Sequence, residues 1–124
     1  KADKGYLPDP HSLENLAEKK KNEKILVLAA LVHRELARLL SSLAFSQTNY
    51  INEAVGAYIK SLSLFSGLLI LIRNDIILKE TLRTLGELTY ILEKEEVEEE
   101  LRKIGIVIKT FVNGILKVLR IKTG

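Results

Sequence analysis

The segment from Tyr50 to Ile72, YINEAVGAYIKSLSLFSGLLILI, decides the fold of this 124-residue chain. Its larger apolar residues recur at alternating steps of four and three, the seam of a helix that packs against nearly parallel neighbours. A second line on the same helix consists mostly of small residues. A helix with two such faces is expected in the middle of a helical bundle rather than at its edge.

The line of small residues is also a candidate contact surface, because small side chains let two helix backbones approach closely. It includes Gly56, Ser63 and Gly67. We expect these residues to contact another helix of the same chain, a second copy or a partner protein. Ile106, an apolar residue among polar neighbours on the last predicted helix, is a further candidate contact.

Composition limits the class of protein. Apolar residues make up 47% of the chain and charged residues 28%, as in one ordinary globular domain. Without cysteine there is no disulfide, thiolate nucleophile or cysteine metal site. Abundant Lys and Glu without Cys, Met or Trp predict a thermophilic source. No signal-peptide pattern is visible, so a cytoplasmic location is expected.

The two prolines, Pro8 and Pro10, lie at the start of the chain, and no later proline breaks a helix. We therefore expect an extended arm over residues 1–11 and a single helical domain over residues 12–124, with Ser12 as the first N-cap. A charged run interrupts the apolar pattern after Leu13. This favours a short lead helix that ends near Asn22, although one long helix to Phe45 is the alternative.

Two further turns are expected at residues 46–49 and 73–75, where Asn74 or Asp75 would cap the third helix. The third helix would end near Leu92, and the last would begin within residues 93–96. Short connections between amphipathic helices make neighbours antiparallel. The predicted fold is all-α, a four-helix up-down bundle with a short N-terminal lead helix.

The alternating spacing also predicts the core. The residues expected to be buried are Leu36, Leu39, Leu43, Val55, Leu62, Phe65, Leu69, Leu82, Leu85, Leu101, Ile108, Phe111 and Ile115.

Basic residues gather on one side of the last helix. On a wheel of about 100° per residue they share an arc of roughly 120°. Such a stripe suits contact with a nucleic-acid backbone or an acidic protein, and a solvated helix face is the simpler interpretation. The candidate contact residues are Arg102, Lys103, Lys109, Asn113, Lys117 and Arg120.

No pattern in the sequence indicates catalysis or metal binding. His33 has neither a Glu-x-x-His partner nor other converging ligands, which metal sites in helical bundles require. The glutamates of residues 93–100 lack a basic partner that would separate their pKa values. We therefore expect no enzyme activity, no cofactor, no metal and no small-molecule substrate.

The sequence favours a non-enzymatic helical interaction module, a small subunit or domain that docks into a larger assembly. Its partner would be another protein chain, either a second copy or a different protein, and not a membrane. The alternative is a nucleic-acid-binding accessory domain that uses the basic stripe. In general shape the chain resembles small helical subunits of CRISPR effector complexes and accessory domains of archaeal replication proteins.

Overall fold

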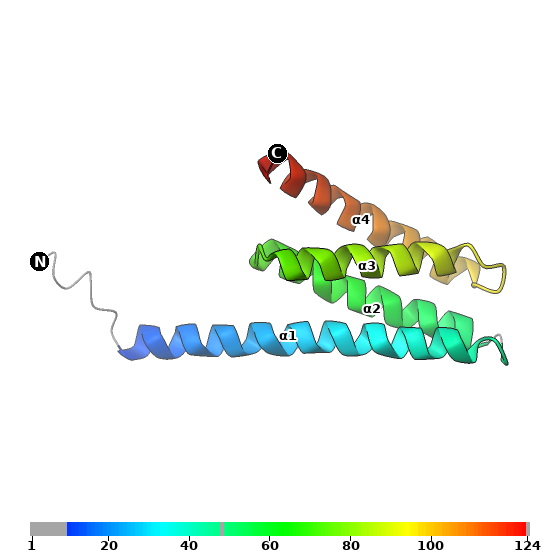
Figure 1. Ribbon diagram of the computed structural model, residues 1–124, viewed down its shortest axis with the longest axis horizontal. Coiled ribbons are helices and arrows are strands. Elements are labelled where there is room, and N and C mark those ends of the chain that lie inside the picture. Colours follow the sequence, from blue (N-terminus) through cyan, green and yellow to red (C-terminus); the bar gives the residue numbers. More distant parts are fainter. Residues whose placement is uncertain (1–9, 48, 124) are drawn as a thin grey trace, which may run out of the picture.

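The computed structural model describes residues 10–47 and 49–123, and its side chains over residues 11–47 and 49–119. Regular structure in these ranges is helical, which confirms the all-α prediction. The four helices are α1 (Pro10–Leu43), α2 (Tyr50–Leu71), α3 (Asp75–Leu92) and α4 (Glu99–Thr123) (Figure 1). Residues 1–9, most of the predicted arm, lie outside the described residues.

Helix α1 is continuous, so the short lead helix is not observed and the alternative of one long helix is correct. The charged run from Glu18 to Lys24 consists largely of Glu and Lys, which are good helix formers and do not oblige the helix to break. The helix begins at Pro10, because proline is well accommodated at the first helical position. Ser12 therefore lies inside the first turn and is not the N-cap.

Helix α2 is the centre of the fold, as its sequence predicts, and it packs against each of the other three helices. Val55, Leu62 and Phe65 are completely buried, and Leu69 is 1% exposed. Consecutive helices run in alternating directions, with α1 and α4 on opposite sides of the central pair (Figure 1). In the described residues α1 has no extensive contact with α4, so the helices form an open arrangement.

The other helices bury a line of residues that lies one position away from the predicted seam. On α1 the buried residues are Ala30, Arg34 and Ala37, and on α3 they include Thr81 and Thr84. The hydroxyls of both threonines donate to carbonyls of the preceding turn at 2.7 Å, so they remain hydrogen-bonded inside the core. On α1 the small residues Ala30 and Ala37 thus lie on the buried side, whereas the buried line of α3 mixes the two threonines with large residues such as Leu88.

Five residues that were predicted to be buried are therefore exposed, and those predictions are wrong. Their exposed fractions range from 40% to 57%. Four further predictions fall on partly buried residues, Leu85, Leu101, Ile108 and Ile115. The exposed five are Leu36, Leu39, Leu43, Leu82 and Phe111.

On α4 the buried line contains Gly105, Val112 and Leu116. A Cβ at Gly105 would lie 2.9 Å from both methyl groups of Leu92, so any larger residue would oblige the Leu92 side chain to shift. Added Cβ atoms at the other glycines of the described helices, Gly56, Gly67, Gly86 and Gly114, would meet nothing within 4 Å.

The turns are fixed by two asparagines. Asn74 caps α3, as predicted, because its side chain accepts a hydrogen bond from the N–H of Ile76 at 2.7 Å. Asn52 of α2 donates to the carbonyl of Glu96 at 3.1 Å and accepts from the N–H of Glu98 at 2.8 Å. These bonds hold the α3–α4 turn against α2, and α4 begins at Glu99, later than predicted.

Among the described helices, α2 is long and apolar enough to cross a membrane by length and composition. In the relevant window 56% of the residues are buried against the rest of the chain. This burial agrees with the central position of α2 in the fold.

The position of the buried seam on α3 is testable with one matched pair of substitutions. Leu88 is completely buried, whereas Leu82 is 42% exposed on the same helix. We expect Leu88→Ala to lower the free energy of unfolding by about 2–5 kcal/mol because it leaves a cavity, and Leu82→Ala to lower it by less than about 1 kcal/mol. Denaturation by urea measures both, and equal losses would contradict the observed seam.

Candidate interaction surfaces

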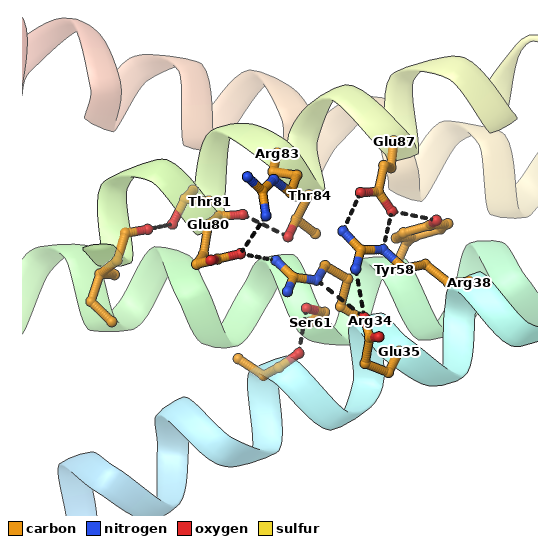
Figure 2. Close-up of polar contacts among 12 residues, drawn as sticks. Arg34, Glu35, Arg38, Tyr58, Ser61, Glu80, Thr81, Arg83, Thr84 and Glu87 are labelled. Atoms are coloured by element: carbon orange, nitrogen blue, oxygen red, sulfur yellow. Dashed lines mark hydrogen bonds and ion pairs between the residues drawn. The ribbon is translucent and has the colours of Figure 1, made fainter. Parts of the chain in front are cut away.

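A network of ion pairs joins α1 to α3 across the central helix (Figure 2). Arg38 binds both carboxylate oxygens of Glu87, with its Nε 2.9 Å from Oε1 and its Nη2 2.6 Å from Oε2. Arg34 donates to the carboxylate of Glu80, two turns earlier on α3. Glu35 accepts from Nη1 of Arg38 at 2.7 Å, so both guanidinium groups have a partner on α3 and a second carboxylate nearby.

Helix α2 contributes two hydroxyl groups to the same region. Tyr58 donates to Oε1 of Glu87 at 2.8 Å, and Ser61 donates to the carbonyl of Ala30 at 2.6 Å. Burial raises the pKa of Tyr58, and its hydrogen bond to the ionised Glu87 raises that pKa further. The phenol therefore stays protonated and acts as a fixed donor.

Both acidic members of the network are held in the ionised state. The hydrogen bond from Arg34 is the main reason that the pKa of Glu80 lies below its ordinary value of 4.5. Burial alone would raise the pKa of Glu87, but the hydrogen bonds from Arg38 and Tyr58, together with the guanidinium charges, lower it. A side chain as buried as that of Arg34, which is 7% exposed, requires such a counter-charge.

Sequence reasoning missed this network, although its spacing was visible. Arg34 and Arg38 are four residues apart, and Glu80 and Glu87 are seven apart, so each pair lies on one face of its helix. The signal was that Arg34 and Arg38 lie along one side of the helix with Ala30 and Ala37. A line of small and charged residues does not stand out beside a line of bulky apolar ones.

The predicted basic stripe is only partly available for contact. Arg102 donates to the carbonyl groups of Leu92, Lys94 and Val97, and thereby caps the C-terminal end of α3. Lys103 is exposed and pairs with Glu100 at 3.9 Å. Asn113 and Lys117 are exposed and Lys109 is half-buried, whereas the side chain of Arg120 lies outside the described residues.

The candidate contacts on the small-residue line remain largely open. Gly56 is half-buried, whereas Ser63 and Gly67 are exposed. Added Cβ atoms at Gly56 and Gly67 would meet nothing within 4 Å, so none of the described residues packs closely over them. Ile106 is 50% exposed on α4. The use of these residues as contacts stays a prediction.

A line of exposed apolar residues lies on α1, on the side away from α2. We call it the outer stripe. Its members are exposed by between 40% and 63%, although three of them, Leu36, Leu39 and Leu43, were predicted to be buried. The outer stripe consists of Ile25, Leu28, Val32, Leu36, Leu39 and Leu43.

Two grooves flank α1 at its two ends. The C-terminal groove, of about 550 Å³, lies beside the ion-pair network and is lined by Tyr58, Glu87 and Tyr90 among others. The N-terminal groove, of about 520 Å³, lies between α1 and the α2–α3 turn. Its lining includes Lys24, Leu28 and Ile72.

The described residues contain no group of three or more His, Asp or Glu side chains arranged to hold a metal ion. Comparisons of the chain with protein-family models, with curated proteins and with solved structures give no match.

The network predicts a particular dependence of stability on pH. Because the pKa values of Glu80 and Glu87 are lower in the folded protein than their ordinary value of 4.5, these carboxylates stabilise the fold above that pH. This contribution is lost as the pH falls below 4.5 towards the folded pKa values. We expect Glu80→Gln/Glu87→Gln to be less stable at pH 7, where Arg34 keeps its charge, and to lose less stability on acidification.

Urea denaturation at a series of pH values measures this effect. The control is Glu93→Gln/Glu95→Gln, which alters two exposed carboxylates of the α3–α4 turn. The control should keep the wild-type pH profile, and an identical profile in the network variant would contradict the assignment.

The capping role of Arg102 can be tested by comparing its substitution with that of the neighbouring Lys103. Arg102→Ala leaves carbonyl groups at the end of α3 without their donor, so we expect the free energy of unfolding to fall by about 1–3 kcal/mol. Lys103→Ala removes one exposed ion pair and should change it by less than about 1 kcal/mol. Thermal or urea unfolding distinguishes the two, and equal effects would exclude a special role for Arg102.

Proposed function

We propose that this protein is a non-enzymatic helical interaction module that docks into a larger assembly through the outer stripe. The observation that carries the proposal is the exposure of six aliphatic side chains along one face of α1. A line of this kind is the usual contact face of a helix that packs against another helix. A partner helix on this face would also extend the open arrangement towards a complete bundle.

The state of the ion-pair network supports a structural role for the polar residues. Glu87 is paired with Arg38 and Tyr58, and its pKa is lowered rather than matched to proton transfer near neutral pH. The network joins α1 to the rest of the fold and so presents the outer stripe on a supported helix.

A nucleic-acid-binding accessory domain is the second candidate. It is favoured by Lys103, Lys109 and Lys117, which lie on one side of α4 with at least part of each side chain exposed. It is weakened by Arg102, which is engaged with carbonyl groups of this chain. In this second role the chain would be an accessory domain of a replication-type or CRISPR-type complex.

Oligonucleotide binding separates the two candidates. We expect fluorescence anisotropy with random single- and double-stranded oligonucleotides to show no specific uptake by the wild-type protein. Phosphate contacts would instead give an affinity that falls linearly with salt on a logarithmic scale.

The matched variants are Lys109→Glu/Lys117→Glu on α4 and Val32→Lys/Leu39→Lys on the outer stripe. Salt-sensitive binding that disappears in the α4 variant and persists in the stripe variant would replace the interaction module with the nucleic-acid function.

A further inference from the structure

Resting on the proposed function, we propose that the partner of the outer stripe is a second copy of this chain, paired in the antiparallel direction about a two-fold axis near residue 34 of α1. The stripe is nearly symmetric about this position. Ile25 and Leu43 lie nine residues on either side of it, and Val32 and Leu36 lie two residues on either side. A two-fold axis would therefore place apolar residues opposite apolar residues along the whole stripe.

Side-chain sizes favour the antiparallel direction. In that direction Leu39 lies opposite Ala29 of the second copy, so a large residue meets a small one. In a parallel pair Ala29 would lie opposite Ala29, which leaves a gap between the helices. Leu39 would lie opposite Leu39, which forces the helices apart. Alternation of large and small residues across an interface is the arrangement that packs without voids.

The distribution of charge favours the same direction. The line of the outer stripe continues towards the N-terminus through Lys21, Glu18 and Glu14. A parallel pair would place each of these residues opposite the same residue of the second copy, so that like charges would face each other. Lysines concentrate near the N-terminal end of α1, whereas glutamates concentrate in the α3–α4 turn at the opposite end of the molecule (Figure 1). Antiparallel pairing brings these oppositely charged ends to the same level.

The ends of α1 offer a matching anchor and groove. Phe45, just beyond the C-terminal end of α1, is 96% exposed. It lies eleven residues after residue 34, and Glu23, which lines the N-terminal groove, lies eleven residues before it. Each Phe45 would therefore come level with the N-terminal groove of the second copy, about 17 Å from the axis. A buried aromatic residue in such a groove is the usual anchor of an interface.

The area of the stripe suits a dimer. Its six residues together expose about as much surface as three fully exposed aliphatic residues. This is roughly 600 Å², the upper end of the largest apolar patch on a typical monomer. With Phe45 included, the exposed apolar surface available for burial approaches about 800 Å², the usual area per partner in stable complexes.

Light scattering over a range of protein concentrations tests the dimer. We expect the wild-type protein to have twice the mass of the chain, and Val32→Lys/Leu39→Lys to have the mass of one chain. The substituted side chains are 63% and 57% exposed, so the variant should keep its helical circular dichroism and cooperative unfolding. Ile76→Lys/Val107→Lys changes equally exposed residues on α3 and α4 and should remain a dimer.

The role of Phe45 has its own pair of variants. Phe45→Ser should raise the dissociation constant about tenfold or more, because it removes the anchor. Phe111→Ser, a change at a half-exposed residue of α4, should leave it unchanged. Equal effects of the two substitutions would overturn the seating of Phe45 in the N-terminal groove.

Disulfide cross-linking tests the direction in which the two α1 helices pair. The chain has no native cysteine, so introduced cysteines can form disulfides only with each other. A mixture of Ile25→Cys and Leu43→Cys proteins should form a mixed covalent dimer under mild oxidation. Ile25→Cys alone should not, because its two thiols would be about 27 Å apart along the helices. A covalent dimer of Ile25→Cys alone would show a parallel pair and overturn the proposal.

Failure of the dimer and failure of the proposed function give different results. A wild-type protein with the mass of one chain at every concentration, or a dimer that survives Val32→Lys/Leu39→Lys, overturns the second copy as partner. The interaction module itself is overturned by salt-sensitive oligonucleotide binding that depends on Lys109 and Lys117, which is a separate measurement.

Discussion

The close approach of α1 to α2 is the constraint on which the rest of the structure depends. Ala30 and Ala37 are completely buried in this contact, and Ser61 reaches the carbonyl of Ala30 at 2.6 Å. Larger residues at these positions would move α1 outward. Arg34 and Arg38 would then no longer be positioned beside the carboxylates of α3, because both side chains start from the same face of α1.

The ion-pair network follows from this geometry and gives it specificity. A buried ion pair adds little net stability over well-packed apolar residues, but removal of one partner is costly. The network therefore disfavours a rotation of α1 that would bring the larger outer stripe onto α2. Such a rotation would bury more apolar surface, yet it would leave Glu80 and Glu87 without Arg34 and Arg38. The charged residues thus determine which face of α1 stays exposed.

The sequence alone predicted the four main helices and the central place of α2, because periodicity and turn residues are local signals. It also favoured a short lead helix that is not observed, and it placed the start of α4 too early. It also identified Asn74 as a cap. It failed on the seams of α1, α3 and α4, because the lines richest in bulky apolar residues are not the buried lines of these helices. Thr81, Ala37 and Gly105 are buried because they are small, which depends on the distance between helices. The role of Arg102 as a cap likewise depends on where the end of α3 lies relative to α4.

The first part of α1 has a further consequence for the behaviour of the protein. Residues 11–22 are all exposed, and in Figure 1 this part of α1 extends past the ends of the other helices. A helix of this length without a packing partner is marginal in water. The local stability of α1 therefore falls from the region around Ala37, which is buried, to the N-terminal end of the same helix. A partner that covered residues 11–22 would stabilise them in the helical state. The local stability of α1 would then be similar along its whole length.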